Sequence, residues 1–500
     1  MAILSPLHLV GSPALPSLLV FLVALLLVYT LYQRRFHPLA SLPGPYSASL
    51  SRLWITKHSW DGDMNTTMID LHHKHGSLIR TGPNEISVSD LSAIKQIYGA
   101  GTKFVKSDWY SVWQGHRQYD LFGERNERKH AEQRRLVSRA YAMESLKDLE
   151  PYVDDAVHVF LDHMSELSGR VVDMGNWVQL FAFDVIGEIT FSKRFGFMDA
   201  AGDDGSFKQI ERALVSAAWV GQVPWLYWTL DALTPYIGNH LGIAARHGTL
   251  RRFAVQEITA RQDRGGHQQD ILSKLKAVQK AKPDEMDENA VASMATSNLF
   301  AGSDTTAISI RAIIYYLLKN PHCKRKLIEE IDHFNREGKL SDPVKLGEAD
   351  AMPYLQAVMY EALRLHPAVG MSLPRVTPPG GANVADHYIP AGTVIGVNPW
   401  VIHRNKSICG EDVESFRPER WMDEEKKGDM QRFFFAFGAG ARTCIGRNIS
   451  WMEMSKLIPT LFLHYNLELS EPEKEWTMRC YWFVMQTGVN VHLTKRGATE

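Results

Sequence analysis

The sequence predicts a mainly α-helical fold with a small β portion, preceded by one N-terminal transmembrane helix. Several long stretches repeat apolar residues with the period of a helix, the strand-like stretches are few and short, and residues 1–33 carry no charged side chain. The chain has 500 residues, of which 45% are hydrophobic and 22% charged, so it can form a large core. A formal net charge of −1 argues against nucleic acid as a partner.

The N-terminus has the composition of a membrane anchor. Residues 15–32 consist mainly of Leu, Val, Phe and Ala, long enough to span or nearly span a bilayer. Arg34 and Arg35 follow, which places the rest of the chain in the cytosol by the positive-inside rule. A cleaved signal peptide would begin with a basic region, which is absent. We therefore expect an uncleaved anchor over residues 1–35.

The remainder reads as one domain. Residues 36–50 contain three prolines and form a proline-rich hinge, and residues 51–500 show no internal repeat or low-complexity linker. The four cysteines are dispersed without a C-x-x-C pair, so a disulfide framework or structural zinc site is not expected. We expect long helices over 124–141, 146–167, 177–191, 207–230 with a break at Pro224, 287–320 and 354–366. Short strands are expected over 78–81, 85–88, 394–397 and 489–493.

Cys444 lies in the most informative segment. Residues 437–446 read FGAGARTCIG and fit the pattern F-x-x-G-x-R-x-C-x-G. Glycines allow a backbone to approach a flat cofactor closely, and a metal-bound thiolate needs donors and positive charge nearby. Residues 448–457 read as an amphipathic helix, whose N-terminus would direct N–H groups towards the sulfur. The alternative is a buried structural cysteine in a glycine-rich turn.

A second unusual segment lies inside the longest helix. Residues 301–306 read AGSDTT, a poor combination for a helix interior, and such local inconsistency often marks function. Gly302 would leave room for a diatomic ligand beside the backbone. The alternative is a Ser/Thr-rich bend whose hydroxyls bond to the helix's own carbonyls.

These segments resemble the motifs of the cytochrome P450 family, and the resemblance covers nearly the whole chain after the anchor. The loop at 437–446 resembles the haem-thiolate loop, and residues 301–306 match the oxygen-activation pattern. The resemblance implies the cytochrome P450 fold with haem b as cofactor. Cys444 would be the axial ligand of the haem iron, and Asp304 and Thr305 would be catalytic, with Thr305 hydrogen-bonding bound dioxygen and Asp304 relaying protons. Phe437, Gly440 and Gly446 would shape the cofactor loop.

Further residues match the family's haem-anchoring and bracing positions. The resemblance implies that His130, Arg134, Arg375 and Arg442 hold the haem propionates, although His130 could instead be a solvated surface residue. It also implies a buried structural network of Glu361, Arg364 and Arg420 that braces the haem pocket. Trp421 replaces the usual Phe, which should only alter packing.

The resemblance also implies partners. Microsomal members take electrons from NADPH–cytochrome P450 reductase, with cytochrome b5 as an additional donor, and this chain has no nucleotide-binding loop of its own. The basic residues of 124–141 are either a solvated charged face or a docking patch for an acidic donor: Arg125, Arg128, Lys129 and Arg135. Aromatic and apolar residues at the family's substrate-recognition segments indicate a lipophilic small molecule as substrate.

The expected function is that of a membrane-anchored haem-thiolate monooxygenase. Residues 36–40, 80–85 and 442–450 look like those of filamentous-fungal members, many of which tailor secondary metabolites. The resemblance implies a single-pass protein of the endoplasmic reticulum membrane with its catalytic domain facing the cytosol. Two alternatives remain: a haem-thiolate isomerase or dehydratase on the same fold, and a non-enzymatic haem-binding protein. The presence of both Asp304 and Thr305 argues against the first, and the predicted relay and donor patch argue against the second.

Overall fold

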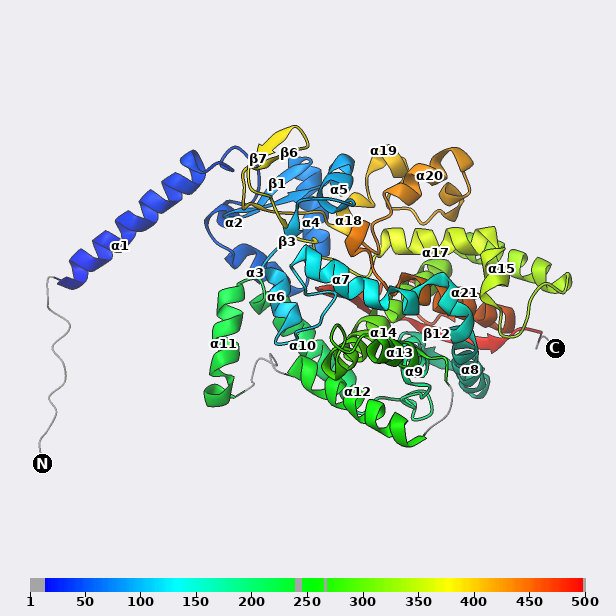
Figure 1. Cartoon of the computed structure of the whole chain (residues 1–500). Coiled ribbons are helices and arrows are strands. Elements are labelled where there is room, and N and C mark those ends of the chain that lie inside the picture. Colours follow the sequence, from blue (N-terminus) through cyan, green and yellow to red (C-terminus); the bar gives the residue numbers. More distant parts are fainter. Residues whose placement is uncertain (1–13, 239–244, 265–267, 498–500) are drawn as a thin grey trace, which may run out of the picture.

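The protein folds as predicted, mainly into helices with small sheets, and one helix stands away from the body (Figure 1). The structure is a computed structural model that describes residues 14–238, 245–264 and 268–497. Residues 1–13 of the expected anchor lie outside the described residues.

The α-helices have the following bounds: α1 Ala14–Leu31, α2 Tyr46–Leu50, α3 Leu53–Asp61, α4 Met64–His75, α5 Leu91–Tyr98, α6 Trp109–Gln114, α7 Glu127–Val137, α8 Met143–Leu167, α9 Met174–Phe191, α10 Ser206–Val220, α11 Pro224–Ile237, α12 Ala245–Arg264, α13 Ile271–Ala281, α14 Glu288–Lys319, α15 Pro321–Arg336, α16 Leu346–Asp350, α17 Pro353–Leu365, α18 Pro399–Ile402, α19 Lys406–Cys409, α20 Glu424–Arg432 and α21 Arg447–His464. Short π- or 3₁₀-helical turns cover Tyr32–Phe36, Ser138–Tyr141, Pro418–Trp421 and Gly440–Arg442.

The strands are short and form small sheets: β1 Leu78–Gly82, β2 Glu85–Val88, β3 Val105–Lys106, β4 Val171–Asp173, β5 Arg375–Val376, β6 Ala382–Val384, β7 His387–Ile389, β8 Val394–Gly396, β9 Tyr465–Leu469, β10 Thr477–Tyr481, β11 Phe483–Thr487 and β12 Asn490–Lys495. The largest sheet has the order β1-β2-β8-β5-β3, and a second sheet has the order β4-β12-β9. β10 pairs with β11, and β6 pairs with β7.

Every helix and strand expected from the sequence is present, with shifted ends. Helix α7 begins after Asn126, whose side chain accepts the backbone N–H of Lys129 at 3.0 Å and caps the helix. The expected break at Pro224 is confirmed, and this proline begins α11 rather than ending the helix before it. Proline suits a first turn, because the missing N–H would have no partner there.

Helices α9 and α14 form the centre of the main core. Nearly every side chain of α9 is buried, and α14 crosses the middle of the molecule (Figure 1). A Cβ on Gly302 would come within 2.6 Å of Ile186 Cδ1, so glycine allows these two helices to pack closely. The interpretation of Gly302 as room for a diatomic ligand is therefore wrong, because this face of the backbone is covered by α9.

The segment after α1 is attached to the largest sheet. Arg80 in β1 is buried and donates to the backbone carbonyl of Gln33 at 2.8 Å and to its side-chain Oε1 at 2.6 Å. The backbone N–H of Arg80 also donates to the carbonyl of Pro43 at 2.7 Å. The side chain of Leu39 is 1% exposed within a core cluster. These contacts fix where the chain leaves α1.

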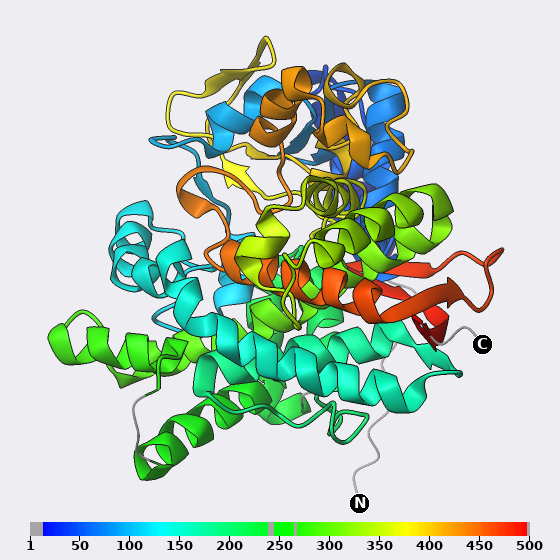
Figure 2. The same cartoon turned by 90° about the vertical axis from the view of Figure 1, so that its right-hand side faces the viewer.

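Helix α21 lies alongside α8, as Figure 2 shows, and carries a buried cation into that contact. The side chain of Lys456 donates to Glu150 at 2.8 Å and to the carbonyl of Val344 at 3.0 Å, and Asp154 lies 2.7 Å away. A buried lysine needs such partners, because an unpaired charge in the core is costly. The N-terminal end of α21 is thereby held in place, with the Cys444 loop before it.

Candidate functional site

Cys444 lies three residues before Arg447, the first residue of α21. Its backbone N–H donates to the carbonyl of Phe437 at 2.9 Å, which closes the loop. Gly440 has φ of 63°, and a Cβ there would come within 1.8 Å of the carbonyl oxygen of Tyr98, so only glycine fits. The Cys444 side chain is exposed, in contrast to Cys323, Cys409 and Cys480, which are buried.

The surroundings of the Cys444 sulfur favour a thiolate only in part. Protein atoms around the thiol raise its pKa by desolvation, while the backbone N–H groups of Gly446 and Arg447 and the charge of Arg134 lower it. These donors lie at the N-terminal end of α21, where unpaired N–H groups and the helix dipole favour an anion. A coordinated metal deprotonates a thiol outright. The Cys444 sulfur is thus accessible, and the backbone N–H groups around it suit a metal-bound thiolate.

The predicted oxygen-activation segment lies on the neighbouring helix. Thr306 Oγ1 lies 3.1 Å from Ser450 Oγ, which joins this turn of α14 to the first turn of α21. Ala301 is exposed and Thr305 half-buried, although α14 is otherwise largely buried. Thr305 donates to the carbonyl of Ala301 at 2.7 Å, the local bonding pattern weighed from the sequence. Its oxygen still has lone pairs that can accept a hydrogen bond.

Asp304 points to the other side of α14, into the contact with α9. Its Oδ1 accepts a hydrogen bond from Gln179 Nε2 at 2.5 Å, and its Oδ2 is buried without a hydrogen-bond partner. Gln179 Oε1 in turn accepts from Arg311 Nη2 at 2.7 Å. Burial raises the pKa of Asp304 to about 6, against the hydrogen bond from Gln179 and the charge of Arg311.

Basic side chains gather around His130, which is 2% exposed and therefore not the solvated surface residue that the sequence left open. Burial is the largest cause that lowers the pKa of His130 to about 3, and the charges of four cations contribute to the same shift: Arg442, Lys106, Arg134 and Arg375. The imidazole is neutral at physiological pH, so it adds a hydrogen-bonding group without a further charge.

Lys106 belongs to this cluster, and the sequence analysis missed it. Strands β3 and β5 are antiparallel with Lys106 opposite Arg375, so the two buried cations lie on one face of the sheet. Lys106 donates to the carbonyl of Phe122, and its Nζ lies 4.3 Å from the centre of the Tyr110 ring. Burial and the charges of Arg375 and Arg442 lower the pKa of Lys106 well below its usual value. Like charges placed opposite each other are unfavourable unless an anion lies between them.

The three other predicted anchoring residues have different partners. Arg134 donates to the carbonyl of Thr443 at 2.8 Å, and Arg375 donates to the Tyr110 hydroxyl at 3.0 Å. Arg442 is paired with Glu127: its Nε donates to Oε2 at 3.0 Å, and its Nη2 lies 2.8 Å from Oε1 without hydrogen-bond geometry. In the part of the chain that the structure describes, Lys106, Arg134 and Arg375 form no ion pair with a carboxylate.

The structure brings Glu361, Arg364 and Arg420 together as one buried network. Glu361 accepts from Arg364 at 2.8 and 2.9 Å and from Arg420 Nε at 2.8 Å, and all three side chains are buried. The charges of both arginines lower the pKa of Glu361 despite its burial. Trp421 Nε1 also donates to Glu361, at 2.8 Å. The expectation that Trp421 alters only packing is therefore wrong, because the indole adds a donor that Phe lacks.

The solvent side of α7 carries Arg128, Lys129 and Arg135, with Arg125 just before the helix, and three of these four residues have a carboxylate partner. Arg125 lies 2.6 Å from Asp108, Arg128 lies 3.0 Å from Glu132, and Lys129 lies 3.1 Å from Glu124.
Arg135 is also exposed. The opposite side of α7 reaches the Cys444 loop through Arg134. This helix therefore connects an exposed basic face with the loop that carries the cysteine.

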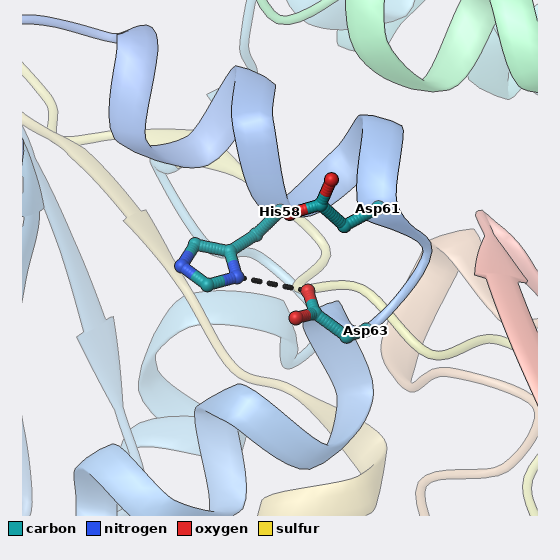
Figure 3. A group of neighbouring side chains, drawn as sticks. All are labelled: His58, Asp61 and Asp63. Atoms are coloured by element: carbon teal, nitrogen blue, oxygen red, sulfur yellow. Dashed lines mark hydrogen bonds and ion pairs between the residues drawn. The ribbon is translucent and has the colours of Figure 1, made fainter.

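One group of potential metal ligands stands apart from these elements: His58, Asp61 and Asp63, at the corner between α3 and α4 (Figure 3). His58 Nδ1 lies 2.8 Å from Asp63 Oδ1, and Asp61 forms an ion pair with Lys57. Both carboxylates already have partners that account for their positions.

Comparison with known proteins decides the family. The sequence model described as Cytochrome P450 matches residues 42–493. The chain is a cytochrome P450. It is 39% identical to the cytochrome P450 monooxygenase hepC of Aspergillus oryzae, over 93% of this chain and 95% of that protein. It is 36% identical to the cytochrome P450 monooxygenase cicH of Emericella nidulans, over 97% of this chain and 100% of that protein. It is 34% identical to a pisatin demethylase of Fusarium vanettenii, over 93% of this chain and 90% of that protein.

Membership of the cytochrome P450 family implies a haem held by a cysteine thiolate, and the site fits such a group. The site has an accessible cysteine, an exposed alanine on the facing helix and a cluster of cations, three of which have no carboxylate partner among the described residues. These features suit a flat cofactor with anionic substituents. The chain is thus an oxidoreductase of the monooxygenase type, whose cofactor supplies the activation of dioxygen when it is bound.

Proposed function

We propose that this cytochrome P450 uses haem b, ligated by Cys444, to insert one oxygen atom of dioxygen into a lipophilic small molecule. The observation that carries this proposal is the link between Thr306 and Ser450, which sets the turn of α14 with Thr305 against the helix that follows Cys444. The thiolate donors and the oxygen-handling hydroxyl thereby belong to one site.

In this proposal each side chain has a defined task. The cofactor's propionates are bound by Lys106, Arg134, Arg375 and Arg442, with His130 as a neutral hydrogen-bonding partner. Thr305 offers its hydroxyl oxygen as a hydrogen-bond acceptor where dioxygen binds, and Asp304 holds the proton that the reaction consumes. Phe437, Gly440 and Gly446 keep the loop backbone close to the cofactor. Glu361, Arg364 and Arg420 brace the fold around the site.

The substrate is proposed to be lipophilic because apolar side chains remain partly exposed inside the body. Phe300 on α14 and Ala368 and Val369 after α17 are half-buried, as is Ile445 beside Cys444. Apolar lining with few polar groups is typical of sites for lipophilic ligands. The fungal relatives favour a secondary metabolite as substrate, and one of them is a pisatin demethylase.

Electrons are proposed to come from NADPH–cytochrome P450 reductase, with cytochrome b5 as an additional donor. The exposed basic side of α7 supports this, since its inner side contacts the Cys444 loop through Arg134. Complementary charge speeds the encounter with an acidic partner.

A membrane location is supported by the helical segment over residues 16–36, which is long and apolar enough by composition to cross a bilayer. We propose a single-pass protein of the endoplasmic reticulum membrane with residues 51–500 as the cytosolic catalytic domain and residues 36–50 as a proline-rich connector. Helix α11 lies on the side of the body from which α1 projects (Figure 1). It carries the exposed side chains of Trp225 and Tyr236, which support a further lipid contact there.

The test is oxygen labelling with the full-length protein and reductase in microsomes. A panel of lipophilic compounds is first screened for a substrate-induced shift of the haem absorption, and hits are incubated with NADPH under ¹⁸O₂. The proposal expects one labelled oxygen atom in the product. Turnover without dioxygen or NADPH would instead establish the isomerase or dehydratase alternative, and haem binding without any turnover would favour a haem-binding protein.

A further inference from the structure

Gln179 joins Asp304 to the guanidinium of Arg311. It lies on α9, outside every sequence motif, and its side chain is 5% exposed. Its amide spans the gap between Arg311 and Asp304, with hydrogen bonds of 2.7 and 2.5 Å. Arg311 and Asp304 are themselves buried, at 7% and 4% exposure.

The direction of both hydrogen bonds is fixed by chemistry. A guanidinium can only donate, so Arg311 must face the carbonyl oxygen of the Gln179 amide. The NH₂ group of Gln179 then faces Asp304 and donates to Oδ1. Arg311 is held in turn by a second bond, from its Nε to the carbonyl of Gly175 at 2.7 Å. The amide cannot flip without setting two donors against each other.

This arrangement makes the two oxygens of Asp304 unequal. Oδ1 receives the amide hydrogen, whereas Oδ2 is buried and has no hydrogen-bond partner. A carboxylic acid needs one oxygen for its proton, and Oδ2 is the one left for it. Other charges that act on Asp304 are Arg311 on its own helix, which favours the anion, and Glu211 on α10, which opposes it.

We propose that Gln179 is a positioning residue for proton delivery: it orients Asp304 so that Oδ2 carries the proton, and it stabilises the carboxylate after the proton has left. This inference rests on the proposed monooxygenase function. In the step, the O–H bond at Oδ2 breaks and its proton passes to a water molecule. The carboxylate keeps the electron pair, hydrogen-bonded to Gln179 and near Arg311, until a hydronium ion from solvent returns a proton and leaves as water.

Two substitutions test the amide itself. Gln179→Leu keeps the approximate size but removes the donor, and Gln179→Glu keeps the acceptor for Arg311 while placing a second carboxylate beside Asp304. Both should raise the pKa of Asp304 above its value of about 6, because the anion loses a hydrogen bond or gains a like charge. A lost hydrogen bond to a charged group corresponds to a shift of about one to two pH units.

Infrared titration of the haem-loaded full chain measures the pKa of Asp304 without turnover. The C=O band of the protonated carboxyl is followed from acid to neutral pH, and subtracting the Asp304→Asn spectrum isolates Asp304. The matched control is Gln486→Leu, since Gln486 is also buried and donates to α14, at the Ile308 carbonyl 3.0 Å away. We expect the midpoint to rise in both Gln179 variants and to stay unchanged in the control.

A midpoint in Gln179→Leu and Gln179→Glu that equals the wild-type value would overturn the inference. With reductase and NADPH, the Gln179 variants should also release more peroxide per NADPH than Gln486→Leu. The two failures are distinguishable, because a wild-type protein that never consumes dioxygen contradicts the proposed function, whereas normal turnover with unshifted titration contradicts only the role of Gln179.

Discussion

Glu361→Gln offers the most direct test of the bracing network. The carboxylate accepts hydrogen bonds from Arg364, Arg420 and Trp421 and from the backbone N–H of Arg417 at 3.0 Å. The amide removes the negative charge but keeps the volume, so two buried guanidinium groups lose their shared counter-ion. Removing one partner of a buried ion pair typically costs about 3–5 kcal/mol, a large part of a total stability of about 5–15 kcal/mol.

The assay is guanidinium unfolding of the haem-loaded protein, followed by far-UV circular dichroism and by haem absorption. The control is Glu414→Gln, because Glu414 is largely exposed and pairs with Arg404 at 2.9 Å, where a loss of about 0–1 kcal/mol is expected. The pKa of Glu361 is lowered in the folded state, so its contribution is present above the unfolded carboxyl pKa and is lost as pH falls through the folded value. Equal unfolding midpoints for the two variants at neutral pH would refute the assigned role of the network.

Three further substitutions have distinct expected results. Lys106→Met should increase the stability of the haem-free protein, because it removes the charge opposite Arg375, and it should also speed the transfer of haem to apomyoglobin. The control Lys103→Met, at an exposed site, should change neither quantity. Slower haem loss in Lys106→Met would exclude propionate binding by Lys106. Thr305→Ala should keep the haem spectrum but raise peroxide release per NADPH. The control Thr296→Ala removes an equivalent hydrogen bond, to the carbonyl of Ala292, and should leave peroxide release unchanged. Equal peroxide release in the two variants would show that Thr305 has no role in oxygen handling. Trp421→Phe should lower the free energy of unfolding by about 1.5–3 kcal/mol, because the hydrogen bond to Glu361 is lost. An unchanged midpoint in guanidinium unfolding would show that the indole contributes packing only.

Much of the fold was predictable because its signals are local. Contiguous residues encode the helical repeat of apolar side chains in α14, the proline that begins α11 and the glycine-rich loop before α21. The charged motif at 361–364 was also found from its spacing, and its partner Arg420 from a second motif. Helix ends were less predictable, since they depend on caps such as Asn126.

The parts that could not be predicted depend on contacts between distant segments. Lys106 becomes a member of the cation cluster only because a two-residue strand pairs with another that lies 269 positions later, at Arg375. Gln179 occurs in an apolar helix with no motif, and its role depends on the packing of α9 against α14. The purpose of Gly302 was misjudged for the same reason, because the residue that covers it, Ile186, is also on α9. The stretch 177–191 also contains Asp184, Glu188 and Thr190, so its sequence did not single out Gln179.

The central claim is that Cys444 binds the haem iron as a thiolate. The most direct measurement is the carbon monoxide difference spectrum of the dithionite-reduced, full-length protein, compared with that of Cys444→Ser. The account predicts a strongly red-shifted Soret band in the wild type and its loss in the variant. A well-folded wild-type protein with a band typical of histidine-ligated haem, or a red-shifted band that survives in Cys444→Ser, would contradict it.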